Sequence, residues 1–539
     1  MGRHRRAAAV LVLLAALASS AGAQSSQPAP AAAGPASPKA PARFTDAARR
    51  VKLARAFPEI DRLAAAHAAR EHVPGAVWAI VVDGELAHLG TAGTRRAGAD
   101  APVDGDTVFR IASMTKSFTA MAILALRDEG RLTLDDPVER HVPELRTLDY
   151  PTADAPRITL RHLLSHSAGF PEDNPWGDQQ LAATEDELTA MLRRGIPFSN
   201  APGLAYEYSN LGFAILGRVV ARVSGMPYRD FVASRILKPL GMASTTLEAS
   251  EVPPERLAHG YRWEDGRWKE EPPLPDGAFG SMGGLLTSVR DLARYVAAFL
   301  AAWPPRDGPE AGPIRRASLR EMQQVWRDQP AVVSLDGADG GVRLKAAAYG
   351  YGLYVGQTCD FDHVVWHGGG LPGFGSLMRW LPEYGVGFIA FGNRTYTGWS
   401  GVADQAVALL AATGGLQPRA VQPSPALIAA KDTVSRLFAS WDDGVIEPVA
   451  SVNLFLDRSK ERRRAEFEAL RSRLGACRAD AAFEFVENAL RGDWLLRCER
   501  GRARVSVTLA PTLPPTIQYM EIREAPERDG GSRRPSCPR

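Results

Sequence analysis

The apolar positions between residues 43 and 416 predict strands at both ends of this segment and helices in between. Two stretches have the pattern of β-hairpins, in which apolar runs flank a turn rich in Gly, Pro or Asp. They lie at residues 77–90, around Asp83-Gly84, and at residues 374–391, around a Pro-Glu-Tyr-Gly turn. The simplest assembly is an α/β (α+β) domain with one antiparallel sheet flanked by helices. The helical part, about residues 113–283, is then inserted in the middle of the sheet.

Helical spacing of apolar residues marks the main helices of this domain. We expect them at residues 45–70 with a break near Pro58, and at residues 113–128, 211–223 and 400–412. The helix at 113–128 is apolar on most sides, so it should be buried.

The pattern changes after residue 416. Residues 417–424 contain two Pro in a polar stretch and are expected to be a linker. Residues 425–525 predict a small α+β domain, with two helices first and an antiparallel sheet after them. The expected helices lie near 425–440 and 458–474, and the expected strands near 482–489, 493–498, 503–509 and 516–522. The charged tail, residues 526–539, is expected to be disordered.

The N-terminus has the pattern of a secretory signal. A basic start is followed by the apolar run Ala7–Ala18 and by Ala21-Gly22-Ala23, which fits a cleavage site. Residues 1–23 are therefore predicted to be a signal peptide, and the Ala/Pro-rich residues 24–42 a tether. The expected location is periplasmic or secreted, with no membrane span after cleavage; the alternative is an uncleaved anchor.

Composition and charge limit the classes of partner that the protein is expected to bind. The chain is 45% hydrophobic with a net charge of +3. Removal of Arg3, Arg5 and Arg6 with the signal would leave a neutral protein, which gives no reason to expect nucleic acid as a partner. The expected partner is a small-molecule or peptide substrate, with cell-wall-derived peptides among the candidates, and the oligomeric state is left open.

The chain has four cysteines, and export would permit disulfides. Cys477 and Cys498 flank an expected strand pair, which favours a bridge between them; the alternative is four free thiols. No CxxC motif or Cys/His cluster indicates zinc. His162 and His166 are four residues apart, but no acidic ligand follows at a useful spacing, so no metal and no cofactor are expected.

Ser113 and Lys116 form an S-x-x-K motif at the start of the helix at 113–128. This spacing puts both side chains on one helical face, where Lys116 could take the hydroxyl proton if burial lowered its pKa. Tyr208 and Asn210 form a Y-x-N triplet before the helix at 211–223. A phenol near two cations could ionise and act as a base. Each motif alone also fits an ordinary helix start.

His367 precedes three glycines that lead into the second hairpin. Glycines let a substrate lie close to a strand edge, and backbone N–H groups there could form half of an oxyanion hole. The N–H of Ser113 would be the other half. The alternative is a glycine-rich turn with a structural histidine.

Together and in this order, these motifs resemble those of the class C β-lactamases, their carboxylesterase relatives, and the DD-peptidases and D-aminopeptidases of the same fold. Ser113/Lys116 resembles the S-x-x-K of that family, Tyr208/Asn210 its Y-x-N, and His367-Gly368-Gly369 stands where it has K-T-G. Flanking segments such as Leu164-Ser-His-Ser-Ala-Gly169 extend the resemblance over about residues 45–415. It implies a β-lactamase/transpeptidase-like fold.

The resemblance implies a role for each of these residues. Ser113 would form an acyl-enzyme, Lys116 and Tyr208 would move its proton, and Asn210, His367 and Gly369 would contact substrate. The N–H groups of Ser113 and Gly370 would hold the oxyanion. His367 replaces a lysine and is expected to titrate near pH 6.5, so carboxylate binding should be weaker at pH 7.5, with less β-lactamase and DD-carboxypeptidase character.

The function that follows is an exported serine hydrolase acting on a short ester, a D-amino peptide or a β-lactam. The alternative is a peptidoglycan or β-lactam sensor that acylates but turns over poorly. Retention of Ser113, Lys116 and Tyr208 favours turnover.

Overall fold

The computed structural model describes residues 41–334, 343–480 and 482–525. The predicted signal peptide, most of the predicted tether and the tail at 526–539 lie outside the described residues. None of the helices in the described ranges is long and apolar enough to cross a membrane.

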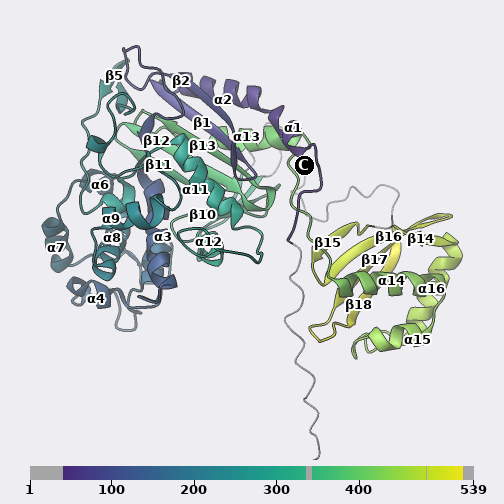
Figure 1. The fold of residues 1–539 in the computed structure, drawn as a ribbon. Coiled ribbons are helices and arrows are strands. Elements are labelled where there is room, and N and C mark those ends of the chain that lie inside the picture. The colour runs from purple at the N-terminus through teal and green to yellow at the C-terminus, as the bar shows by residue number, and fades with distance from the viewer. Residues whose placement is uncertain (1–40, 335–342, 481, 526–539) are drawn as a thin grey trace, which may run out of the picture. The chain divides into compact units, whose positions relative to one another are not determined.

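A nine-stranded sheet runs through the described part of the first 416 residues (Figure 1). Its order is β2-β1-β13-β12-β11-β10-β9-β7, with β8 paired to β9. The strands are β1 (Gly75–Val82), β2 (Glu85–Gly93), β7 (Arg327–Asp328), β8 (Val332–Ser334), β9 (Arg343–Tyr349), β10 (Tyr354–Thr358), β11 (Val364–Leu371), β12 (Phe374–Leu381) and β13 (Val386–Gly392). The register pairs Ala76 with Gly392 and Val82 with Val386, antiparallel. The early and late hairpins therefore join in one sheet, as the sequence predicts.

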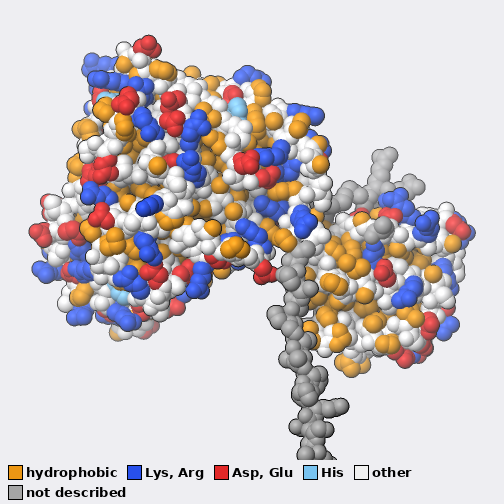
Figure 2. All heavy atoms as spheres, viewed as in Figure 1, with side chains coloured by type: hydrophobic (Ala, Val, Ile, Leu, Met, Phe, Trp, Pro, Cys, Tyr) orange, Lys and Arg blue, Asp and Glu red, His pale blue; other side chains and the backbone are white. Residues whose placement is uncertain are grey.

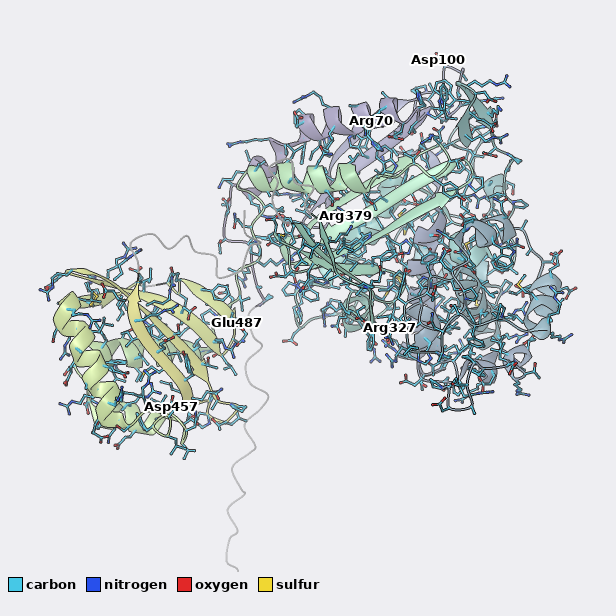
Figure 3. All side chains as sticks on the ribbon, turned by 180° about the vertical axis from the view of Figure 1, so that it is seen from behind. Arg70, Asp100, Arg327, Arg379, Asp457 and Glu487 are labelled. Carbon is cyan, nitrogen blue, oxygen red and sulfur yellow. A yellow bond between two sulfur atoms is a disulfide. The ribbon has the colours of Figure 1, made fainter. Side chains whose placement is uncertain are left out.

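Both faces of this sheet are covered, which explains why β1 is apolar at every position. Val77, Ala79 and Val81 belong to one buried core, and Trp78 and Ile80 to another. The first core lies beneath α11 (Val289–Ala301); the second lies beneath α1 (Arg49–Ala54), α2 (Phe57–Arg70) and α13 (Ser400–Ala412). Arg379 of β12, labelled in Figure 3, binds Asp404 of α13 and fixes that helix to the sheet.

The helical part lies between β3 (Val108–Arg110) and β6 (Leu286–Ser288), which pair with each other. It contains α3 (Thr115–Asp128), α4 (Val138–His141), α5 (Leu160–Leu164), α6 (Asn174–Gly177), α7 (Glu185–Arg194), α8 (Asn210–Ser224), α9 (Tyr228–Val232), α10 (Gly280–Gly283) and the small hairpin β4 (Tyr261–Glu264) and β5 (Arg267–Glu270). Helix α12 (Arg316–Met322) follows β6 and α11. The β3–β6 pairing holds the start of α3 beside the end of the helical part.

Several details differ from the sequence prediction. The break in the first helix comes before Pro58, which lies in the first turn of α2, where its missing N–H leaves no hydrogen bond unmade. Strands β3 to β10, the strand Cys477–Ala479 and the helix Asp443–Ile446 were not expected, because these short segments lack a clear periodic pattern of apolar and polar residues.

Residues 425–525 form a separate, third core of their own. Its elements are α14 (Pro425–Ala439), α15 (Asp443–Ile446), α16 (Lys460–Leu474), β14 (Cys477–Ala479), β15 (Phe485–Asn488), β16 (Arg491–Cys498), β17 (Gly501–Leu509) and β18 (Ile517–Ala525). The sheet order is β14-β16-β17-β18, with β15 paired to β16, and Val434, Trp494 and Val505 are buried between helices and sheet.

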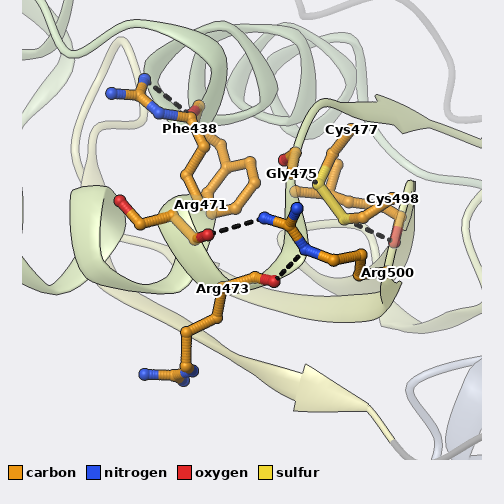
Figure 4. Close-up of a disulfide and its surroundings, with 9 residues drawn as sticks. Phe438, Arg471, Arg473, Gly475, Cys477, Cys498 and Arg500 are labelled. Atoms are coloured by element: carbon orange, nitrogen blue, oxygen red, sulfur yellow. Dashed lines mark hydrogen bonds between the residues drawn. A yellow bond between two sulfur atoms is a disulfide. The ribbon is translucent and has the colours of Figure 1, made fainter.

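A disulfide joins Cys477 of β14 to Cys498 of β16, the pairing that the sequence favours (Figure 4). Beside it, Arg500 donates to the carbonyls of Ser472 and Arg473 at the C-terminal end of α16, at 2.7 Å each. The bridge and this arginine therefore connect the sheet to the end of the helix.

Over the face shown in Figure 2, positive and negative side chains are interspersed.

Candidate active site

Ser113 lies in η1 (Ala112–Met114), the short turn that leads into α3, and is 6% exposed. Ala112 before it has φ 50°, a left-handed conformation that is strained for a residue with a side chain. Neighbouring groups hold the turn: the Ser376 hydroxyl donates to the Ile111 carbonyl at 2.8 Å, and the Thr115 hydroxyl donates to the Ala112 carbonyl at 2.7 Å. The backbone around Ser113 is thus fixed by the sheet and by its own helix.

Lys116 is buried, and its Nζ donates three hydrogen bonds. They reach Ser113 Oγ at 3.0 Å, Asn210 Oδ1 at 2.6 Å and the carbonyl of Met282 at 2.9 Å. Burial lowers the pKa of Lys116 to about 7, against the opposing pull of the Asp178 and Asp173 carboxylates. Near neutral pH a large fraction of Lys116 is therefore the free amine, which can accept the proton of Ser113.

The side chains of Tyr208 and Asn210 approach Ser113 and Lys116 from the start of α8. The Asp173 carboxylate accepts the backbone N–H groups of Asn210 at 2.6 Å and Leu211 at 2.9 Å, so it anchors the first turn of the helix. The Tyr208 phenol is hydrogen-bonded to the side chain of Ser113, and Lys116 Nζ lies 4.8 Å from the centre of its ring.

The idea that Tyr208 ionises is wrong for this structure. Burial, and then the neighbouring Tyr354, raise the pKa of Tyr208 well above 10. The phenol is therefore neutral at ordinary pH and serves as a hydrogen-bond partner that can relay a proton, while Lys116 is the group able to act as base.

The glycines of β11 lie beside the turn that carries Ser113 and form one wall of the site. A Cβ on Gly369 would lie 2.1 Å from the Ile111 carbonyl oxygen, so only glycine lets the strand approach the turn that carries Ser113. A Cβ on Gly370 would lie 2.4 Å from the ring of Tyr396. In the described strands, the pairing of β10 with β11 ends at Trp366, which leaves the edge of β11 beyond it open on that side.

His367 is 1% exposed and does not behave as the sequence predicts. Its Nδ1 lies 2.6 Å from the Gly368 carbonyl, which requires a donor there, so Nε2 accepts from the Tyr349 hydroxyl at 2.8 Å. Burial, with the nearby Lys116 charge, lowers the pKa of His367 to about 3. The expected titration near pH 6.5 is wrong, because the ring is shielded from water and stays neutral.

The sequence considered His162 and His166 only as metal ligands, and it did not single out Asp173 or Asp178. His166 Nδ1 accepts the backbone N–H of Ser209 at 3.0 Å, and its ring lies 4.3 Å from that of Tyr208. His162 Nδ1 accepts the N–H of Thr159 at 3.2 Å and caps α5, so both histidines have structural partners. Asp173 and Asp178 lie in a stretch with no periodic pattern, which is why sequence reasoning missed them.

Comparisons with known proteins identify the family to which the chain is similar. Residues 60–413 match the protein family described as Beta-lactamase. Protein flp of Staphylococcus aureus (strain COL) is 26% identical over 337 residues, which is 62% of each chain. Penicillin-binding protein 4* of Bacillus subtilis (strain 168) is 27% identical over 291 residues, which is 51% of this chain and 58% of the relative. The chain thus spans about three fifths of the length of these curated relatives.

Two solved structures share the fold. The octameric penicillin-binding protein homologue from Pyrococcus abyssi superposes with a TM-score of 0.57 at 22% identity, covering 88% of this chain and 96% of that chain. A class C β-lactamase superposes with a TM-score of 0.52 at 19% identity, covering 66% of this chain and 96% of that chain. With its sheet covered by helices on both faces, the chain has the β-lactamase/transpeptidase fold and belongs to the β-lactamase family.

Proposed function

We propose that this protein is an exported serine hydrolase that cleaves an ester or amide bond through an acyl-enzyme on Ser113. The observation that carries the proposal is the Ser113–Lys116 pair. A serine hydroxyl 3.0 Å from a buried amine with a pKa of about 7 is an activated nucleophile. The family match supports the same reaction class.

We propose the following steps for the reaction. The Lys116 amine takes the proton of Ser113 as Oγ attacks the substrate carbonyl, and the N–H groups of Ser113 and Gly370 stabilise the oxyanion. The tetrahedral adduct collapses, and the leaving group receives a proton from Lys116, directly or through the neutral Tyr208 phenol. Water then attacks the acyl-enzyme by the same route, and the acid and free Ser113 are released.

The substrate is proposed to be a short ester, a D-amino peptide or a β-lactam, in that broad class. His367 stands where many relatives have a cation, and its neutral, buried ring offers no charge to a substrate carboxylate. We therefore expect weaker β-lactamase and DD-carboxypeptidase activity than in an enzyme with lysine at that position.

The test is hydrolysis of p-nitrophenyl acetate and of a penicillin by the wild-type protein and by Ser113→Ala. We expect Ser113→Ala to lower kcat/KM by at least about 10³-fold. The matched control is Ser117→Ala, a buried serine of α3 whose hydroxyl donates to the Met114 carbonyl and accepts from Tyr295. Hydrolysis that survives in Ser113→Ala would contradict the proposal. One burst of product followed by no turnover would indicate the sensor alternative.

A further inference from the structure

The charges around Lys116 favour one kind of substrate. The groups that act on its ammonium are two carboxylates, Asp178 and Asp173. The nearby imidazoles of His166 and His367 have pKa values well below their usual range because both rings are buried, so they carry no charge at neutral pH. Among the described residues, the other charged groups that act on Lys116 are therefore acidic.

The two carboxylates are used differently. Both oxygens of Asp173 accept backbone N–H groups at the start of α8. Asp178 is 1% exposed, and its Oδ2 accepts the hydroxyl of Tyr396 at 2.8 Å. Its Oδ1 is buried and has no hydrogen-bond partner among the described residues. A buried carboxylate oxygen without a donor is costly, and such an exception in a folded protein calls for an explanation.

The position of Asp178 in the site suggests which kind of group would donate a hydrogen bond to its Oδ1. Asp178 begins η3 (Asp178–Gln180), directly after Gly177. A Cβ on Gly177 would lie 2.6 Å from Asn210, the residue that binds Lys116. On its other side, Tyr396 stands against Gly370 of β11 and is 50% exposed. Asp178 therefore lies between Asn210 and the wall that carries the proposed oxyanion donor.

We propose that Asp178 and Tyr396 form a subsite for a positively charged amino group on the acyl side of the substrate. The substrate class is then an α-amino acyl ester or amide, such as a peptide with a free amino terminus. The amino group would donate to Oδ1 of Asp178, and the half-exposed Tyr396 would border it. This inference rests on the proposed function of Ser113.

The contrast with a carboxylate ligand strengthens the assignment. A substrate carboxylate placed here would meet the Asp178 carboxylate. The cation that acts on Asp178 among the described residues is Lys116, which must lose its charge to act as base. A substrate ammonium gains the unused oxygen of Asp178 in a site largely shielded from water, where such a pairing is stronger than at the surface.

The test compares benzyl esters that differ only at the acyl group: D-alanine and L-alanine, propionic acid, and succinic acid as its monobenzyl ester. Benzyl alcohol release gives kcat/KM for each. In the wild type we expect an alanine ester to exceed the propionate ester by about tenfold or more, and the succinate ester to be the slowest. In Asp178→Asn the alanine-to-propionate ratio should fall to about one to two.

The ratio separates binding from chemistry. Any effect of Asp178→Asn on Lys116 or on the fold changes all the esters together and cancels in the ratio. The matched control is Asp276→Asn, because Asp276 also has a buried Oδ1 without a partner among the described residues but lies beside Arg110. Its ratio should stay within about twofold of wild type.

Tyr396→Phe is the second variant, in case Asp178→Asn does not fold. It frees Oδ2 of Asp178 and should keep or raise the alanine-to-propionate ratio. The subsite is wrong if the wild type shows no preference, or if the preference survives in Asp178→Asn or vanishes in Tyr396→Phe. Failure to hydrolyse any of the esters would contradict the proposed function itself.

Discussion

At the scale of single residues, the buried ammonium of Lys116 sets the pH at which the site can work. Lys116 is held by Ser113, Asn210 and the Met282 carbonyl, and its pKa is lowered to about 7 because it is buried. Only the uncharged amine can take the proton of Ser113, so activity is lost as pH falls through this pKa.

The pH dependence of kcat/KM for a substrate that does not ionise, such as p-nitrophenyl acetate, should therefore rise with an apparent pKa of about 7. Asp178 and Asp173 hold the pKa of Lys116 up, so Asp178→Asn should move the rise to lower pH. Because Asp178, with a pKa raised to about 6, interacts with Lys116, the measured values belong to the pair. A flat profile through pH 7, or a shift to higher pH in Asp178→Asn, would contradict this assignment.

His367 gives a second prediction at this scale. Its pKa of about 3 means that the ring should stay neutral from pH 5 to pH 8, with Nδ1 carrying the proton. NMR of protein with ¹⁵N-labelled histidine, assigned with a His367→Gln variant, would follow the ring nitrogens across this range. A titration of His367 near pH 6.5 would show that the ring is open to water.

At the scale of elements, close contact between β11 and the turn at Ser113 builds the site. Gly369→Ala would place a methyl group 2.1 Å from the Ile111 carbonyl oxygen, so the strand would have to move away from Ser113. We expect a loss of about 1–3 kcal/mol of stability and most of the hydrolysis. Thermal unfolding and ester hydrolysis measure the two effects.

Gly368→Ala is the control for this prediction, since the nearest atom to its Cβ, apart from its chain neighbours, would be a carbonyl oxygen at 3.6 Å. Its stability should change by less than about 1 kcal/mol. Equal effects of the two substitutions would mean that the close approach at Gly369 is not what positions the strand.

Local patterns predict the elements well but not their contacts. The hairpins and the helix at 400–412 follow from periodicity and turn residues, and Ser113/Lys116 follows from helical spacing. The neutral state of His367 and the raised pKa of Tyr208 could not be predicted, because both depend on burial by residues distant in sequence. Asp178 and Tyr396 lie 218 positions apart and carry no motif, so only the fold brings them together.

At the scale of the whole molecule, the described chain has separate hydrophobic cores for residues 43–416 and 425–525. The Cys477–Cys498 disulfide closes a loop with a sequence separation of 21 inside the second of these. Replacing both cysteines by serine should lower the unfolding free energy of residues 425–525 by about 3 kcal/mol.

Urea unfolding followed by tryptophan fluorescence measures this loss, because Trp494 is buried in the core of residues 425–525. Ester hydrolysis at Ser113 should stay within about twofold of wild type, since the bridge belongs to another core. A large loss of hydrolysis in the double variant would show that the two cores depend on each other.

The central claim is that Ser113 is the nucleophile, and the most direct measurement is mass spectrometry of the protein mixed with a penicillin or an activated ester. We predict an increase in mass equal to the acyl group, which peptide mapping places on Ser113, and no such increase in Ser113→Ala. An adduct on another residue, or the same adduct in Ser113→Ala, would contradict the account.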